Sequence, residues 1–168
     1  VGAFDLIVRV FAAGDSPDFP EGGRVSQHIG RQLAIGDTIP VSGPFGLHEY
    51  VGGGTFEIGP AEGQRTRLSA KRVGLLAGST GLPPLVAVVA AALADPSDST
   101  SFSLLSHTPS EETILMRSTL DFLARAHPAR LKLWHAVDAV DDEKEWPYST
   151  GELTEALLAE HLPPPRPS

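Results

Sequence analysis

Residues 72–85, RVGLLAGSTGLPPL, join an apolar run to a Gly-Ser-Thr-Gly turn and then to a helix that opens with two prolines. An apolar run followed at once by a helix predicts the strand–turn–helix unit from which parallel sheets are built. The turn of such a unit lies at the carboxyl end of its strand, where backbone N–H groups face a ligand. The segment predicts a place for a phosphate group or a flat cofactor ring, unless it is a plain connector between strand and helix.

The same alternation continues through the second half of the chain. Strand-like apolar runs lie at 73–77, 101–106 and 131–137, and helix-like segments lie at 83–94, 111–127 and 150–161. Strands that alternate with helices predict βαβ units and a parallel sheet. We therefore expect an α/β domain with a parallel sheet over residues 72–168.

The first half has a different pattern, in which short strand-like runs lie between dense glycine turns. These runs are residues 3–12, 37–41, 50–51 and 55–58, with a helix-like segment at 25–33. Short strands with glycine-rich turns predict a small antiparallel β-barrel over residues 1–60. Residues 61–71 carry almost no large apolar side chains and are the expected linker between the two parts.

Composition excludes several classes of function. The 168 residues carry a formal net charge of −8, which argues against a nucleic-acid partner, because phosphate backbones bind basic patches. The chain has no cysteine, so disulfides and thiolate metal ligands are excluded. The longest apolar run, residues 85–94, is too short to span a bilayer.

A second candidate for a ligand loop is GGRVS at residues 22–26. Backbone N–H groups beside glycines, together with an Arg fork and a Ser hydroxyl, suit a pyrophosphate group. The same letters are also typical of a glycine loop with a serine near a helix N-terminus, which would need no ligand.

Standard catalytic and metal motifs do not fit this chain. A nucleophile elbow, G-x-S-x-G, needs a glycine two residues before its serine. Two residues before Ser79 the chain has Ala77, which disfavours a hydrolase. A G-x-G-x-x-G dinucleotide fingerprint is also lacking. The histidines are dispersed without ligand spacing, so we expect no metal site.

Asp138 ends the strand-like run KLWHAVD. A carboxylate at the carboxyl end of a parallel strand can accept hydrogen bonds from ribose hydroxyls. A simple cap of a turn or helix is the alternative role for this side chain.

Six segments, taken in order, resemble the NADH–cytochrome b5 reductase family, which includes the flavin domain of assimilatory nitrate reductases. They are FPEGGRVSQHI (19–29), IGDTIPVSGPFGLHEY (35–50), VGLLAGSTGLPPL (73–85), EETILMR (111–117), RLKLWHAVD (130–138) and EHLPPP (160–165). The spacing between the segments matches as well, so the resemblance covers essentially the whole chain.

The resemblance implies an FAD-binding barrel followed by an NADH-binding α/β domain of ferredoxin reductase-like type. In this family, hydride passes from NADH to the flavin, and single electrons then pass to a haem protein such as cytochrome b5. The resemblance also implies a cytoplasmic protein, or one held at the cytosolic face of a membrane by a segment outside this chain. We expect flanking family segments, R-x-Y-T-P/S before Val1 and C-G-P-P-x-M after Ser168, and with the latter the last strand of the sheet.

The resemblance also assigns residues to the cofactors. Ile7 and Arg9 correspond to the strand that lines the flavin, and Gly23 to Ser26 to the loop that holds the FAD pyrophosphate. The turn from Gly78 to Pro84 is similar to the family's G-G-T-G-I-T-P, and Thr80, which keeps the first threonine, is the candidate catalytic residue. Asp138 corresponds to the acidic residue associated with a preference for NADH over NADPH. The complete set of expected cofactor-binding residues is Ile7, Arg9, Gly23, Arg24, Val25, Ser26, Gly78, Ser79, Thr80, Gly81, Pro83, Pro84 and Asp138.

Three positions depart from the family pattern. Ser79 replaces a glycine where the nicotinamide ring approaches, Pro83 replaces a threonine that contacts FAD, and His135 stands where an aromatic residue is more usual. These departures motivate a competing hypothesis, a non-catalytic domain that uses the same scaffold to bind partners. The flavin domain of a nitrate reductase is a further alternative.

Overall fold

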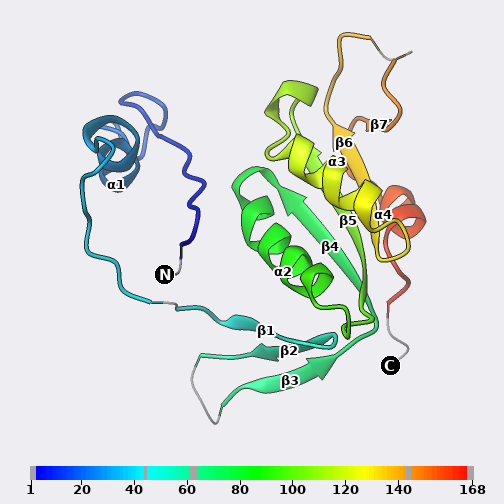
Figure 1. Cartoon of the computed structure of the whole chain (residues 1–168). Helices are drawn as coiled ribbons and strands as arrows, with labels where there is room; N and C mark the ends of the chain where they lie inside the picture. Colours follow the sequence, from blue (N-terminus) through cyan, green and yellow to red (C-terminus); the bar gives the residue numbers. More distant parts are fainter. Residues whose placement is uncertain (1–2, 44, 61–63, 143–144, 166–168) are drawn as a thin grey trace. The chain divides into compact units, whose positions relative to one another are not determined.

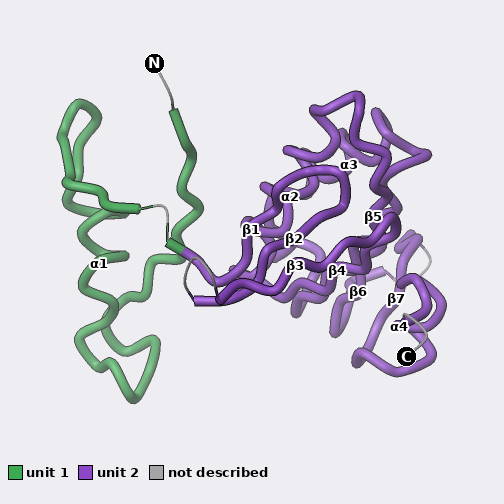
Figure 2. The backbone as a smooth tube through the Cα atoms, turned by 90° about the horizontal axis from the view of Figure 1, so that it is seen from below, with its two compact units in different colours: residues 1–45 green, residues 46–168 purple. Residues whose placement is uncertain are grey.

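The computed structural model of the chain describes residues 3–43, 45–60, 64–142 and 145–165. The chain forms two compact units, residues 1–45 and residues 46–168 (Figure 2). The second unit contains an antiparallel three-stranded sheet followed by a parallel four-stranded sheet. This order confirms the predicted fold class, an antiparallel part followed by an α/β part. The finer domain limits, 1–60 and 72–168 with a linker at 61–71, stay a prediction.

In the described part of residues 1–45, the regular structure is the short helix α1 (Arg24–Gln27) and the π-helical turn η1 (His28–Gln32) that continues it. The helix predicted at 25–33 is therefore confirmed, whereas the strands predicted at 3–12 and 37–41 do not form. No described residue in this unit is buried. A strand pattern without a paired neighbour leaves its N–H and C=O groups unsatisfied, which explains why these two runs stay irregular.

The antiparallel sheet lies at the start of the second unit and has the strand order β1-β2-β3 (Figure 1). Its strands are β1 (His48–Gly52), β2 (Thr55–Ile58) and β3 (Thr66–Ser69). β3 falls within the segment expected to be a linker, residues 61–63 of which lie outside the described part. Gly54 in the β1–β2 turn has a φ of +75°, and a Cβ there would lie 2.0 Å from the Ala70 carbonyl oxygen, so only glycine fits.

The parallel sheet has the order β4-β5-β6-β7, and helices follow three of its strands (Figure 1). Its strands are β4 (Arg72–Gly78), β5 (Ser101–Thr108), β6 (Leu131–Val137) and β7 (Ser149–Thr150). The helices are α2 (Leu82–Ala94), α3 (Arg117–Ala126) and α4 (Glu155–His161), with short turns η2 (Ser79–Gly81) and η3 (Glu111–Thr113). These bounds confirm the strands predicted at 73–77, 101–106 and 131–137 and the helix predicted at 83–94.

Two of the predicted helices begin later than the sequence pattern indicated. Residues 111–127 do not form one helix, because Met116 adopts a left-handed backbone with φ +55° and α3 starts only after it. The helix predicted at 150–161 begins at Glu155, where the Thr154 hydroxyl accepts a hydrogen bond from the Leu157 N–H. Thr150 instead belongs to β7, which pairs with the end of β6.

The hydrophobic core lies on one face of the parallel sheet. Leu75, Phe102 and Leu104 alternate toward this face, where Val89 of α2 and Leu120 of α3 pack against them. α4 and the residues after it lie on the opposite face. There the His161 ring stacks on Trp134 with 3.9 Å between ring centroids.

A buried carboxylate joins the antiparallel sheet to the loop before β5. Asp98 is 3% exposed and accepts hydrogen bonds from the Gly53 N–H at 3.0 Å, the Thr100 N–H at 2.8 Å and the Tyr50 hydroxyl. The Tyr50 oxygen in turn accepts a bond from the Gly54 N–H at 3.0 Å. Burial alone would raise the pKa of Asp98, but the hydrogen bonds from Thr100, Tyr50 and Gly53 outweigh it and lower the pKa to about 2.

Replacing this carboxylate tests its role in stability. Asp98→Asn places an amide NH2 among donors, and we expect it to lower the free energy of unfolding by about 2–4 kcal/mol. Because the folded-state pKa lies below the ordinary value, the stabilisation is complete above pH 4 and is lost as the pH falls through about 2. Urea unfolding at several pH values measures both effects. Glu152→Gln, which removes an exposed carboxylate, is the control, and an equal loss in both variants would contradict the assignment.

Candidate functional site

The parallel register brings three segments to one edge of the sheet. Gly78 at the end of β4 pairs with His107 of β5, which pairs with Ala136 of β6. Asp138 follows β6 directly, and its N–H donates to the Thr108 carbonyl at 3.1 Å. The 78–81 turn and Asp138 therefore lie at the same carboxyl edge, as parallel strands require.

The turn that follows β4 is open and exposed. Gly78, Ser79, Thr80 and Gly81 are all exposed, and a Cβ added at Gly81 would meet nothing within 4 Å. Among the described residues, neither the Ser79 nor the Thr80 hydroxyl has a hydrogen-bond partner. The hydroxyl of Thr80 is thus free to bond a ligand that lies over the turn.

The start of α2 offers few backbone donors. Pro83 and Pro84 have no N–H group, and the Leu82 N–H donates to the Ser79 carbonyl. A phosphate group held at a helix start needs several free N–H groups. Of the two ligands that the sequence allowed at this turn, a flat ring over an open, side-chain-poor surface fits better than a phosphate.

Ser79 carries backbone strain at the centre of the turn. Its φ is +43°, in the left-handed region that side chains with a Cβ avoid. This conformation explains why glycine suits the position.

Asp138 has a histidine beside it that sequence analysis did not select. The Nε2 atom of His107 lies 3.1 Å from the Asp138 carboxylate, which is 55% exposed, but the ring N–H is not aimed at the oxygen. The two side chains form an ion pair when the imidazole is protonated. The sequence predicted that β5 and β6 belong to one parallel sheet, and this pairing was the one signal from which the proximity of His107 and Asp138 could have been predicted.

A buried histidine supports the strand that leads to Asp138. The His135 side chain is fully buried, and its Nδ1 lies 2.5 Å from the Ser106 hydroxyl oxygen of β5. Burial lowers the pKa of His135, which favours the neutral ring. The imidazole also packs edge-on against Tyr148 at 5.0 Å. At this position the histidine therefore fills the core as an aromatic residue would.

The loop at residues 22–26 is held by the backbone and by Ser26. The Ser26 hydroxyl accepts from the Phe11 N–H and donates to the Gly23 carbonyl, both at 3.2 Å. A Cβ at Gly23 would lie 2.5 Å from that hydroxyl oxygen, so a larger residue there would displace the Ser26 side chain from its hydrogen bonds. Ser26 thus holds a glycine loop beside a helix N-terminus, which is the structural alternative to a pyrophosphate-binding loop. Its hydroxyl oxygen keeps one lone pair for a further donor.

The other expected flavin residues lie exposed in the same unit. Arg24 and Val25 are at the start of α1, with Val25 72% exposed. Ile7 is 43% exposed, and the Arg9 guanidinium lies 4.9 Å above the centroid of the Phe11 ring. All of these residues lie in residues 1–45, whereas the expected nicotinamide residues lie in residues 46–168.

The described part of the chain contains neither a candidate metal site nor a candidate membrane-spanning helix. No three His, Asp or Glu side chains gather there in a way that could hold a metal ion. None of the described helices has the length and apolar character needed to cross a membrane.

Comparison with known proteins matches both halves of the chain to oxidoreductases. Residues 1–50 match the family profile of the oxidoreductase FAD-binding domain, and residues 75–168 match that of the oxidoreductase NAD-binding domain. The chain is 41% identical over 165 residues to NADH-cytochrome b5 reductase 2 of Xenopus tropicalis, covering 98% of this chain and 53% of that protein. It is 39% identical over 162 residues to a nitrate reductase [NADH] of Volvox carteri, covering 96% of this chain and 18% of that protein.

A solved structure agrees with these matches. The cytochrome b5 reductase domain of Ulva prolifera nitrate reductase superposes with a TM-score of 0.80 at 34% sequence identity, covering 95% of this chain and 58% of that one. The chain spans about half the length of the curated reductases that it matches.

A substitution at Ser79 tests whether the backbone of the 78–81 turn is left-handed at this residue. Ser79→Gly should raise the free energy of unfolding by about 0.5–1 kcal/mol, because relief of the left-handed strain exceeds the added entropy of the unfolded chain. Thr80→Gly, at a neighbour without a positive φ, should instead lower stability. Urea unfolding midpoints compare the two, and a less stable Ser79→Gly protein would contradict the turn conformation.

Proposed function

The chain belongs to the NADH–cytochrome b5 reductase family, and from this membership we propose that it forms part of the FAD and NADH sites of an NADH-oxidising flavoprotein reductase. The observation that carries the proposal is the carboxyl edge of the parallel sheet. There the open 78–81 turn and the exposed Asp138 carboxylate come from β4 and β6 of one sheet.

The residues at this edge suit a reduced nicotinamide dinucleotide. We assign the flat nicotinamide ring to the surface over Ser79, Thr80 and Gly81, where no side chain blocks access above Gly81. We assign Thr80 as the residue that positions the ring, through a hydroxyl that has no partner among the described residues. Asp138 accepts hydrogen bonds from a ribose diol and repels a 2′-phosphate.

The residues of the first unit suit the pyrophosphate of FAD. Arg24 is exposed at the start of α1 and can donate two parallel hydrogen bonds to phosphate oxygens. The Gly23 backbone and the Ser26 hydroxyl shape the loop beside it, and Ile7 and Arg9 lie on the segment assigned to the flavin ring. When bound, FAD supplies the chemistry that accepts hydride and releases single electrons.

The electron acceptor is proposed from the relatives alone. Their names point to a haem protein such as cytochrome b5, and the nitrate reductases point to a fused acceptor domain as the alternative. We propose that the protein works in the cytoplasm or at the cytosolic face of a membrane. The competing hypothesis is a non-catalytic member of the family. It is motivated by Ser79 and Pro83, the two residues of the turn that depart from the family pattern.

Flavin reduction tests the proposal directly. The intact reductase that contains this chain should purify with bound FAD, and anaerobic NADH should bleach its absorbance at a rate that a stopped-flow instrument can follow. Thr80→Ala should slow the reduction by roughly 3- to 10-fold, the loss expected for one hydrogen bond. Bound FAD that NADH does not bleach would contradict the reductase assignment and favour the non-catalytic alternative.

The role of Asp138 has its own test. Asp138→Ser should lower the ratio of kcat/KM for NADH to that for NADPH by roughly tenfold or more, corresponding to about 1.4 kcal/mol of lost discrimination. Asp141→Ser removes the same charge three residues along the exposed loop and is the matched control. An equal shift in both variants would mean that general charge, rather than Asp138 itself, sets the preference.

A further inference from the structure

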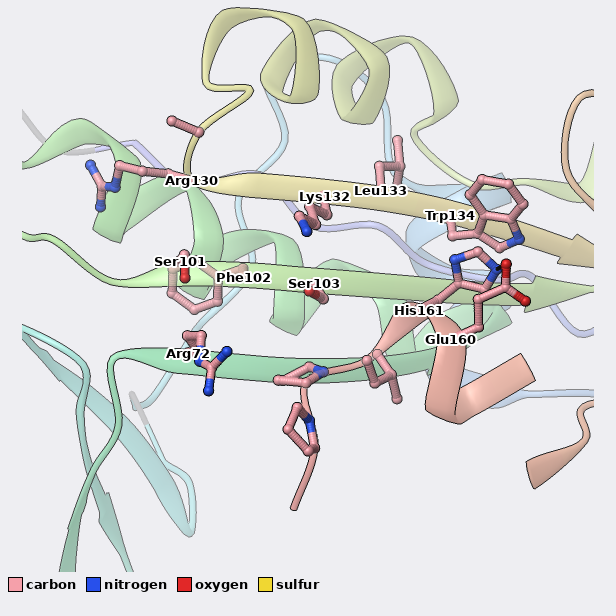
Figure 3. A pocket seen from close by; sticks show the side chains of 14 residues that line it. Arg72, Ser101, Phe102, Ser103, Arg130, Lys132, Leu133, Trp134, Glu160 and His161 are labelled. Atoms are coloured by element: carbon pink, nitrogen blue, oxygen red, sulfur yellow. Dashed lines mark ion pairs between the residues drawn. The ribbon is translucent and has the colours of Figure 1, made fainter. Parts of the chain in front are cut away.

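A cavity lies on the face of the parallel sheet opposite the hydrophobic core. Figure 3 shows it between β4, β5 and β6 on one side and the end of α4 with the following prolines on the other. Its volume is about 470 Å³, within the range of small-molecule sites. Arg72 is the first residue of β4, so the cavity lies at the amino ends of the strands, about 20 Å along β4 from Gly78 at ~3.3 Å per residue. It is therefore separate from the proposed nicotinamide site.

The floor of this cavity is formed by four polar residues of adjacent strands. Arg72 pairs in register with Ser101, and Ser103 pairs in register with Lys132. Residues paired between neighbouring strands lie ~4.8 Å apart, and all four side chains point to the same face. Arg72 on β4 and Lys132 on β6 therefore lie on either side of the two β5 hydroxyls, as Figure 3 shows.

The two cations have no acidic partner. Among the described residues, neither Arg72 nor Lys132 forms an ion pair or a side-chain hydrogen bond. The neighbouring Arg130 behaves differently, because its guanidinium donates to the Ala92 and Thr100 carbonyls. Both side chains are exposed to the cavity. One carboxylate, that of Glu160, also lines the cavity, and it lies 3.9 Å from His161 Nε2. The unpaired positive charge of Arg72 and Lys132 attracts small anions.

The walls of the cavity are fixed by packing. A Cβ at Gly74 would lie 3.0 Å from Pro163 Cδ and 3.6 Å from Leu162 Cβ, so this glycine lets the chain after α4 cross close to β4. The stack of His161 on Trp134, with rings inclined by 14°, closes the far end. Leu162 and Pro163 give the cavity an apolar side beside its cationic floor.

We propose that this cavity binds a small phosphate-bearing molecule, with the phosphate between Arg72 and Lys132. An Arg fork, a Lys ammonium and Ser hydroxyls are the groups that bind phosphate oxygens in proteins. Ser103 contributes a free hydroxyl, whereas the Ser101 hydroxyl also donates to the Lys71 carbonyl at 3.3 Å. The volume exceeds that of one phosphate group, so the body of the molecule lies along Leu162 and Pro163.

Calorimetric titration of the intact, FAD-loaded reductase tests this site. Adenosine monophosphate and inorganic pyrophosphate are the probes, and at least one should bind with one-to-one stoichiometry. Arg72→Gln and Lys132→Gln should each weaken binding at least tenfold, and Arg72→Lys should restore part of it. Arg125→Gln, which removes an exposed cation from α3 on the other face, should change binding less than twofold. Binding of the monophosphate alone would identify a nucleotide ligand, and equal binding of pyrophosphate would identify the phosphate group as sufficient.

Competition separates this site from the dinucleotide site. Saturating NADH should leave binding of the probe unchanged, and the Arg72 and Lys132 variants should keep the wild-type rate of flavin reduction. Displacement of the probe by NADH, equal weakening by Arg125→Gln, or no binding of either probe would overturn the proposal. A failure of NADH to bleach the flavin would count against the proposed function and leave this binding result intact.

Discussion

Asp98 is the group on which the arrangement of residues 46–168 depends. Its carboxylate accepts hydrogen bonds from the Gly53 N–H in the β1–β2 turn and from Thr100 just before β5. The small antiparallel sheet has little buried surface of its own, since β3 is exposed along its whole length. Tyr50 is its main packing residue, with its ring 4.9 Å from Phe56 and 6.4 Å from Phe102. A short sheet of this kind is marginal without such support, so the Asp98 cluster holds β1–β3 beside the parallel sheet.

The parallel sheet in turn fixes the proposed site. Strand register alone brings Gly78, His107 and Asp138 to one edge, although they are far apart in the sequence. Just before this edge, Ser106 of β5 and His135 of β6 are buried and join the two strands through a side-chain hydrogen bond. The exposed residues at the edge contribute little to packing, which leaves their hydroxyl and carboxylate groups available to a ligand.

Sequence patterns predicted the second half of the fold well because its strands are long apolar runs buried against two helices. The first half could not be predicted in the same way. The alternating run at residues 3–12 has strand character, but pairing decides whether such a run becomes a strand, and it has no paired neighbour among the described residues. The break at Met116 depended on a left-handed backbone that no local pattern announced. The sequence alone could not predict the places of His107 and Asp98 or the cavity floor with Arg72 and Lys132, because these depend on strand register and tertiary contacts. The assignments of Arg24, Thr80 and Asp138 to cofactors stay predictions.

The central claim is that the nicotinamide ring lies over the 78–81 turn, at the same edge as Asp138. An isotope-filtered nuclear Overhauser measurement on the intact reductase with the oxidised dinucleotide NAD+ bound, which cannot reduce the flavin, tests this most directly. We predict contacts from the nicotinamide ring protons to the Thr80 methyl group and Gly81, and from the adenosine ribose protons to Asp138. Contacts from either group to Ser103 and Lys132 at the opposite end of the strands, with none to Thr80, would contradict the account.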